Sequence, residues 1–190
     1  MRDLRSKLKR QRLMLTLDQI CDVSLRITNL IWRLPELSRS RRLAVYMATN
    51  GEIDCDWLTE DAWLRKCSVF APVLRGRRLK CAPLKPDSRL LVNHFGIAEP
   101  ECTPQQLIRP RDLDVVIVPL LAFDSHGNRL GMGAGYYDRS FSFIRGRKKW
   151  FHPKLIGVAH EFQRVQRIQV QPWDVPLNVV VTESKVYRFR

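Results

Sequence analysis

The sequence lacks several of the patterns that mark common classes of protein. Its longest apolar run, residues 115–123, is too short to cross a bilayer. No continuous apolar segment follows the basic N-terminus, so we expect no secretory signal. Repeats, low-complexity tracts and linker-like stretches are also missing. We therefore expect a cytoplasmic protein with no membrane partner, folded as a single domain over residues 1–190.

Cysteine and histidine are too sparse and too scattered for a metal or disulfide framework. The five cysteines include no C-x-x-C pair, and no histidine stands at a metal-like interval from any of them. We interpret them as reduced thiols, for which a small buried apolar role is the most frequent, while a catalytic cysteine stays open. The cysteines, histidines and serines also form no evident catalytic triad.

Negative charge is scarce relative to positive charge. There are 33 lysines and arginines against 19 aspartates and glutamates, which gives a formal net charge of +14. Such an excess favours polyanionic partners, including nucleic acid, nucleotides and polycarboxylate ligands. The basic residues are spread in clusters along the chain, so charge alone does not separate a basic enzyme from a nucleic-acid-binding protein. The latter, contacting phosphates through residues 2–12 and 75–80, is the alternative hypothesis.

Hydrophobic periodicity predicts alternating helices and strands. A basic helix is expected over residues 2–12, and a capping box of Thr16 and Gln19 begins a second helix that Pro35 ends. Further helices are expected near residues 57–64 and 135–144, and residues 85–111 read mainly as loop. Strands are expected at residues 43–48, 68–73, 79–84, 115–118, 154–159 and 178–182.

The apolar run at residues 115–118 is the clearest of these strands. A continuous apolar strand is typical of a parallel sheet that is covered on both faces. Together with the alternation of strands and helices, it predicts an α/β fold: one domain, a mainly parallel sheet with helices on both faces, and a Rossmann-like architecture.

Three alternating glycines, Gly131, Gly133 and Gly135, stand between this strand and the next helix. Glycine lets backbone N–H groups approach an anion closely, and the start of a helix adds further unpaired N–H groups. The pattern therefore indicates a phosphate cradle, although a flexible turn would look the same. It is neither a Walker loop, which needs G-K-[ST], nor the dinucleotide fingerprint.

The residues around the glycines strengthen the phosphate interpretation. Arg129 can neutralise phosphate charge, and Tyr136 and Tyr137 offer hydroxyls and aromatic faces. Asp138 is a hard oxygen ligand suited to Mg²⁺ beside a nucleotide. An acidic residue in the first turn of a helix can instead simply complement the helix dipole.

At these residues the chain resembles the 5-formyltetrahydrofolate cyclo-ligase family. The resemblance rests on the stretch L-D-V-V-I-V-P-L-L-A-F-D-S-H-G-N-R-L-G-M-G-A-G-Y-Y-D, residues 113–138. It extends over nearly the whole chain, through the elements Leu4-Arg5, Gly51-Glu52-Ile53-Asp54, Phe95-Gly96-Ile97 and Trp173-Asp174-Val175-Pro176. So long a match is hard to obtain by chance.

The resemblance implies an ATP-dependent ring closure of 5-formyltetrahydrofolate, possibly in polyglutamylated form. ATP phosphorylates the formyl oxygen, the N-10 amine attacks the activated carbon, and 5,10-methenyltetrahydrofolate forms with release of ADP and phosphate. An amide-like oxygen leaves poorly until it is phosphorylated. Catalysis of this kind depends on positioning and charge neutralisation more than on a protein nucleophile.

The resemblance also implies roles for individual residues. It points to Tyr137 and Arg129 as catalytic, to Asp138 and Asp174 as Mg²⁺ ligands, and to Met47, Glu52 and Phe95 as folate contacts. The ATP site would comprise Arg2, Arg5, Arg129, Leu130, Gly131, Met132, Gly133, Ala134, Gly135, Tyr136 and Tyr137. Each folate or metal position has a plainer alternative: Met47 and Phe95 as core, Glu52 as a solvated turn residue, and Asp174 as a helix cap.

Overall fold

A seven-stranded sheet forms the centre of the computed structural model, which describes residues 2–145 and 153–189. The strand order is β11-β10-β9-β6-β1-β2-β3. Their bounds are β1 Arg42–Ala44, β2 Ser68–Arg75, β3 Arg78–Pro83, β6 Val115–Pro119, β9 Lys154–Val158, β10 Val179–Val181 and β11 Val186–Arg188. The five inner strands run parallel, and the edge strands β3 and β11 pair antiparallel. The predicted α/β fold with a mainly parallel sheet is confirmed.

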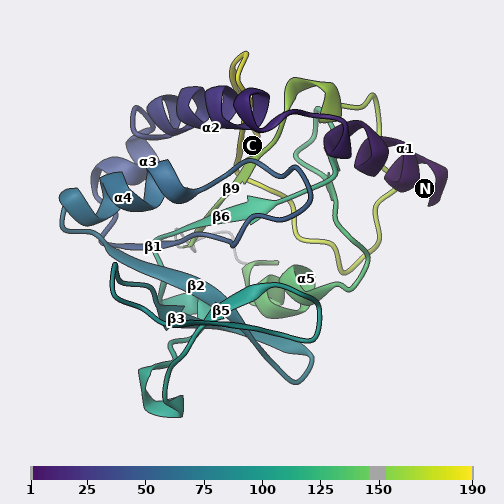
Figure 1. The fold of residues 1–190 in the computed structure, drawn as a ribbon. Helices are drawn as coiled ribbons and strands as arrows, with labels where there is room; N and C mark the ends of the chain where they lie inside the picture. The colour runs from purple at the N-terminus through teal and green to yellow at the C-terminus, as the bar shows by residue number, and fades with distance from the viewer. Residues whose placement is uncertain (1, 146–152, 190) are drawn as a thin grey trace.

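Helices cover both faces of this sheet (Figure 1). On one face, α2 (Leu17–Ile31), α3 (Pro35–Ser38) and α4 (Asp56–Leu64) pack against alternate strand residues such as Leu43 and Ile117. On the other face, Phe141 of α5 (Tyr136–Phe141) packs against the intervening residues, such as Val116. Each of the five inner strands therefore buries side chains on both faces of the sheet, as the apolar run at residues 115–118 predicts.

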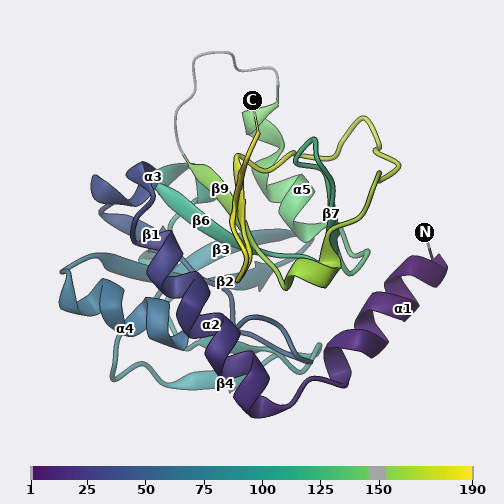
Figure 2. The same cartoon turned by 90° about the horizontal axis from the view of Figure 1, so that it is seen from above.

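The first helix, α1 (Arg2–Leu13), lies at one end of the molecule, away from α2 (Figure 2). Its Leu8 is buried against Leu130 and Ile168, and Leu4 packs against the same small cluster. The Thr16–Gln19 capping box that begins α2 is present, with hydrogen bonds of 2.9 and 3.2 Å. The prediction that Pro35 ends this helix is wrong. The helix ends at Ile31, and Pro35 instead begins α3, because a missing N–H costs nothing in a first helical turn.

Two hairpins were not predicted from the sequence. One joins β4 (Leu90–Val92) to β5 (Ala98–Pro100) within the stretch expected to be loop. The other joins β7 (Ala122–Phe123) to β8 (Arg129–Leu130), where the buried carboxylate of Asp124 accepts backbone N–H groups from His126, Asn128 and Ile168. Both are too short to show a strand period. The remaining short elements are the 3₁₀ turns η1 (Pro104–Gln106), η2 (Pro110–Asp112), η3 (Ser142–Ile144) and η4 (Glu161–Gln163).

None of the helices in residues 2–145 and 153–189 is both long enough and apolar enough to span a bilayer.

Candidate active site

The glycine-rich loop leaves β8 and turns into α5. Gly133 has a φ of +105° and Gly135, the N-cap of α5, has a φ of +67°. A residue with a Cβ is strained at such φ angles. The backbone conformation of the loop therefore favours glycine at two of its three glycine positions. Gly131 has no such angle and instead offers its carbonyl oxygen to Arg5 Nε of α1, at 3.1 Å.

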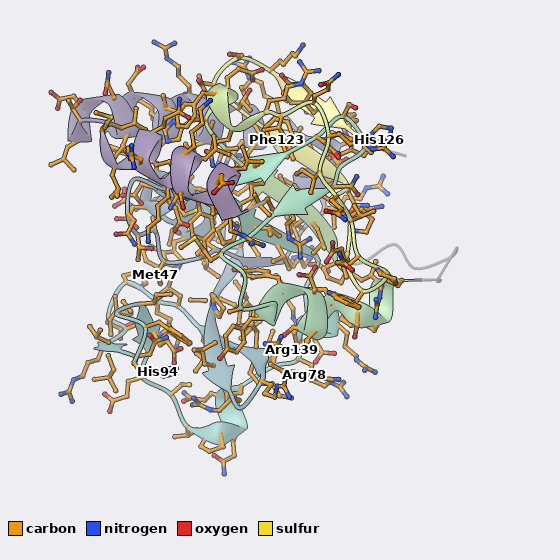
Figure 3. The ribbon with its side chains drawn as sticks, turned by 90° about the vertical axis from the view of Figure 1, so that its right-hand side faces the viewer. Met47, Arg78, His94, Phe123, His126 and Arg139 are labelled. Carbon is orange, nitrogen blue, oxygen red and sulfur yellow. The ribbon has the colours of Figure 1, made fainter. Side chains whose placement is uncertain are left out.

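The loop forms one wall of a pocket of about 380 Å³. Three arginines also line this pocket, and Figure 3 shows two of them, Arg78 and Arg139, together below α5. The pocket is lined by Arg78, Gly133, Ala134, Gly135, Asp138, Arg139, Ser142, Arg145 and Trp173. Exposed backbone at glycines combined with several guanidinium groups suits an anionic ligand such as a polyphosphate.

Two of these arginines are held in place by backbone carbonyls. Arg139 Nε donates to the carbonyl of Arg77 at 2.7 Å, and its guanidinium lies 5.0 Å from the centre of the Tyr136 ring. Arg145 Nη1 donates to the carbonyl of Pro172 at 2.8 Å. The sequence analysis gave Arg139 and Arg145 no role. The only sequence signal was local charge, which does not reveal which clusters meet at the loop.

Arg129 does not line the pocket itself but bonds Asp138, which does. Its side chain is 5% exposed, and its Nη2 lies 2.6 Å from Asp138 Oδ1. Its Nη1 donates to the carbonyl of Val175. Burial lowers the pKa of Arg129, and the nearby carboxylate of Asp138 opposes that shift. The position of Arg129 therefore favours orienting Asp138 over touching a phosphate directly.

The two predicted metal ligands are brought to the same region. Asp138 Oδ1 also accepts the N–H of Val175, the residue after Asp174, at 3.1 Å. Asp174 Oδ2 accepts the N–H of Gln171 at 2.8 Å, so this carboxylate caps a turn. Each aspartate keeps a second oxygen outside these bonds, and carboxylate oxygens suit Mg²⁺. Within the described residues, no group of three or more acidic, histidine or cysteine side chains forms a closed metal cage.

The other predicted ATP contacts fall in different places. Leu130 is 2% exposed and packs in the cluster beneath α1, so its side chain does not reach the pocket. Met132 is 55% exposed at the tip of the loop. Arg2 begins α1, but its side chain lies outside the described part of the structure.

The predicted folate residues lie outside the pocket just described. Glu52 follows the turn after β1, and its carboxylate bonds Arg12 and Thr49. Met47 packs half-buried against the main core and appears above His94 in Figure 3. Phe95, 53% exposed, sits at the tip of the β4–β5 hairpin and contacts Tyr136.

The Tyr137 ring packs beneath the loop, stacked on Phe141 with ring centroids 6.1 Å apart. Burial raises the pKa of Tyr137, and the charge of Glu52 adds to this shift. The hydroxyl is therefore protonated at neutral pH and can act as a hydrogen-bond donor. In the described part of the chain no hydrogen bond engages it.

The family model described as the 5-formyltetrahydrofolate cyclo-ligase family matches residues 1–183. The chain belongs to this family. The cyclo-ligase of Escherichia coli K12 is 34% identical over 187 residues, covering 96% of this chain and all of that protein. The cyclo-ligase of Haemophilus influenzae is 33% identical over 177 residues and covers 92% of each chain.

Solved structures agree with this membership of the cyclo-ligase family. The NMR structure of 5,10-methenyltetrahydrofolate synthetase from Aquifex aeolicus superposes with a TM-score of 0.83, at 33% identity over 99% of this chain and 92% of that one. A 5,10-methenyltetrahydrofolate synthetase from Mycoplasma pneumoniae has a TM-score of 0.73 at 20% identity, covering 96% of this chain and 98% of that one. The latter likeness concerns the fold alone.

Proposed function

We propose that this protein closes the ring of 5-formyltetrahydrofolate to 5,10-methenyltetrahydrofolate, with ATP converted to ADP and phosphate. The observation that carries the proposal is the pocket in which the glycine-rich loop faces Arg78, Arg139 and Arg145. Residues 1–190 act as one catalytic unit, because α1, the loop and the residues after β9 all meet at this pocket.

The ATP phosphates bind the loop between Gly131 and Tyr137. Backbone N–H groups at Gly133 and Gly135 approach the phosphate oxygens, and the arginines neutralise their charge. Arg5 reaches the same loop from α1. Trp173, which lines the pocket and is 59% exposed, offers a flat apolar surface beside the phosphate site.

Asp138 and Asp174 would hold Mg²⁺ at this end of the pocket. Such an ion supplies charge neutralisation of the phosphoryl group in transfer. Arg129 supports the arrangement by fixing one oxygen of Asp138, and the Val175 N–H fixes the same oxygen. The other oxygen of Asp138 then faces the ligand with little freedom to rotate.

The folate occupies the neighbouring space between Met47, Glu52 and Phe95. Phosphorylation of the formyl oxygen there turns it into a leaving group, and the N-10 amine displaces it as phosphate. The Tyr137 hydroxyl, protonated because burial raises its pKa, would donate a hydrogen bond as charge builds on the transferring oxygen. Polyglutamylated folates would gain from the basic surface through electrostatic attraction.

A nucleic-acid-binding role is the weaker hypothesis. It accounts for the net charge of +14, but it does not account for Asp138 in the pocket or for Glu52, which is almost buried beside Arg12. Carboxylates repel a nucleic-acid backbone and suit a metal ion or an N–H donor. We propose a cytoplasmic location for the enzyme, where folates and ATP are both available.

The test is an absorbance assay for methenyl-folate formation from 5-formyltetrahydrofolate, with ATP and Mg²⁺ present or withheld. We expect product only when both are present, together with one ADP per product. A matched reaction containing folic acid, which has no formyl group, should release no ADP. If purified, folded protein forms no product with both ligands saturating, the proposed reaction is wrong.

A further inference from the structure

Arg12, at the end of α1, forms a buried ion pair with Glu52. Arg12 Nη1 lies 3.2 Å from Glu52 Oε1, and the two side chains are 1% and 11% exposed. The other guanidinium nitrogens, Nε and Nη2, are buried and find no hydrogen-bond partner in the described chain. Among the described residues, the hydrogen-bonded ion pair with Glu52 is thus the one polar interaction of the buried Arg12 guanidinium.

Stability does not explain such a pair. Removing two charges from water costs more than one imperfect bond returns, and buried N–H donors without acceptors add to that cost. An apolar pair of similar size would hold the end of α1 at least as well. The pair therefore points to a requirement for the carboxylate itself, held in one place.

The rest of the turn confirms that Glu52 is tightly fixed. Asn50 and Gly51 both have positive φ, and the N–H of Glu52 closes the turn on the Thr49 carbonyl at 3.1 Å. A Cβ on Gly51 would meet the backbone oxygen of Arg12 at 2.4 Å, so α1 presses directly on the turn. On the opposite side, His160 Nε2 donates to the Gly51 carbonyl at 3.3 Å.

The hydrogen bonds leave one acceptor position on this carboxylate. Oε2 accepts both the N–H and the hydroxyl of Thr49, at 3.1 and 3.4 Å. Oε1 accepts only from Arg12, so its second lone pair is unused among the described residues. The free acceptor is thus on the oxygen that Arg12 holds, and Arg12 sets its direction. A pterin ring offers N–H donors of the kind that such an acceptor binds.

Both ends of α1 serve the site. Arg5 and Arg12 are seven residues apart, about two helical turns or roughly 10 Å, and so lie on one face. Arg5 bonds the loop at Gly131, and Arg12 bonds Glu52. Between them, Leu8 is 3% exposed and anchors the helix against Leu130 and Ile168. The helix is therefore positioned to fix the nucleotide loop and the folate turn relative to each other.

We propose that Arg12 is a positioning residue for the folate, which aims the free acceptor of Glu52 at the pterin ring while Arg5 secures the glycine-rich loop. This inference rests on the proposed function, because it takes the folate as the ligand of Glu52. It adds a residue that the sequence analysis did not place in the folate or ATP site and that acts through Glu52.

The test compares Arg12→Met with Arg10→Met, a matched change at an exposed arginine of α1 that has no hydrogen bond or ion pair to any described residue. The dissociation constants of 5-formyltetrahydrofolate and of a non-hydrolysable ATP analogue are measured separately by calorimetric titration. We expect Arg12→Met to weaken folate binding about tenfold, with ATP-analogue binding within about twofold. Arg10→Met should change neither constant by more than about twofold.

A double-mutant cycle with Glu52→Gln then shows whether Arg12 acts through Glu52. We expect Arg12→Met to add less than about twofold to the loss caused by Glu52→Gln alone, because the carboxylate it aims is already gone. Arg12→Lys, which keeps the charge but loses the planar guanidinium, should still weaken folate binding about fivefold. This variant carries the test if Arg12→Met does not fold.

Three results would overturn the inference: equal weakening of both ligands in a folded variant, additive effects of Arg12→Met and Glu52→Gln, or parental folate affinity in Arg12→Lys. In each of them the parent protein still converts 5-formyltetrahydrofolate, so the proposed function stands. If the parent neither binds nor converts that folate, the proposed function fails and the inference fails with it.

Discussion

The Phe95 ring meets the Tyr136 ring edge to face, with centroids 6.0 Å apart and planes at 77°. Phe95 lies at the tip of the β4–β5 hairpin, and Tyr136 is the first residue of α5, directly after the glycine-rich loop. A side chain expected to contact the folate therefore touches one expected to contact ATP. This contact places the two halves of the proposed site next to each other.

Replacing Phe95 should raise the KM for the folate, and its effect should depend on whether Tyr136 is present. An aromatic pair of this geometry contributes about 1 kcal/mol beyond its area, so Phe95→Ala should raise the KM for the folate about fivefold to tenfold. The same change in a Tyr136→Ala background should have a smaller effect, as steady-state kinetics of the four proteins can show. Leu91→Ala, on the same hairpin, should leave KM unchanged. Fully additive effects of the two substitutions would contradict a coupled pair.

Replacing Arg5 should affect ATP more than folate. Arg5→Ala removes the hydrogen bond to Gly131 and a positive charge beside the phosphates, and we expect a rise of about tenfold or more in the KM for ATP. The KM for the folate should change by less than about threefold. Lys9→Ala, an exposed position on the same helix, is the matched control. Equal changes in both KM values would mean that Arg5 only supports the fold.

Asp138 and Asp174 should share one Mg²⁺ ion. Asp138→Asn and Asp174→Asn should each raise the Mg²⁺ concentration for half-maximal activity about tenfold, because each removes one charged ligand. The measurement is the initial rate at saturating ATP as a function of Mg²⁺ concentration. Asp22→Asn, at an exposed position of α2, is the control. A Mg²⁺ dependence that moves for neither variant would argue against this site. So would an experimental structure with the two carboxyl groups well over ~10 Å apart, since one ion and its waters span less.

The hydroxyl of Tyr137 should matter more than its ring. Tyr137→Phe keeps the packing on Phe141 and removes only the donor, so we expect kcat to fall about a hundredfold with little change in thermal stability. The experiment is a single-turnover assay together with thermal unfolding of both proteins. A kcat within a few-fold of the parent, in a folded variant, would leave Tyr137 with a packing role beneath the loop.

His160 should lower the stability of the folded protein in acid. Burial lowers its pKa in the folded protein, so below about pH 6.5 the unfolded chain takes up a proton that the folded chain refuses. Stability from this group is complete above that pH and is lost as the pH falls toward the folded pKa. Thermal unfolding from pH 5 to 8 should therefore show a smaller acid-side decline for His160→Gln than for the parent. Identical pH profiles would exclude His160 as the cause.

Regular elements and the loop were predictable from sequence, whereas the pocket as a whole was not. The apolar run at residues 115–118, the Thr16 capping box and the alternating glycines each carry a local signal that tertiary packing did not change. Arg78 lies 61 positions before Arg139 and 67 before Arg145 in the sequence, and only the folding of β3 beside α5 brings them to one pocket. No periodicity or spacing encodes such a meeting.

Arg129 and Arg12 show that the burial of a charged side chain does not follow from its place along the sequence. Arg129 stands beside the glycines and was expected to face a phosphate, but it is buried against Asp138. Arg12 belongs to the basic helix expected over residues 2–12, and it is among the most deeply buried side chains in the described chain. The sequence does not show whether an arginine faces solvent or the core, because its burial depends on which distant segments pack over it.

The position of α1 also bears on the order in which the protein can assemble during synthesis. This helix leaves the ribosome before the other described elements, yet its bond from Arg5 closes on a residue 126 positions later, and Leu8 packs on Ile168. Until those segments have been translated, α1 has no surface on which to bury its leucines, and a basic helix of 12 residues is marginal alone. Although α1 precedes the other described elements, it is therefore among the last to dock. The enzyme gains its complete site only when nearly all of the chain has emerged.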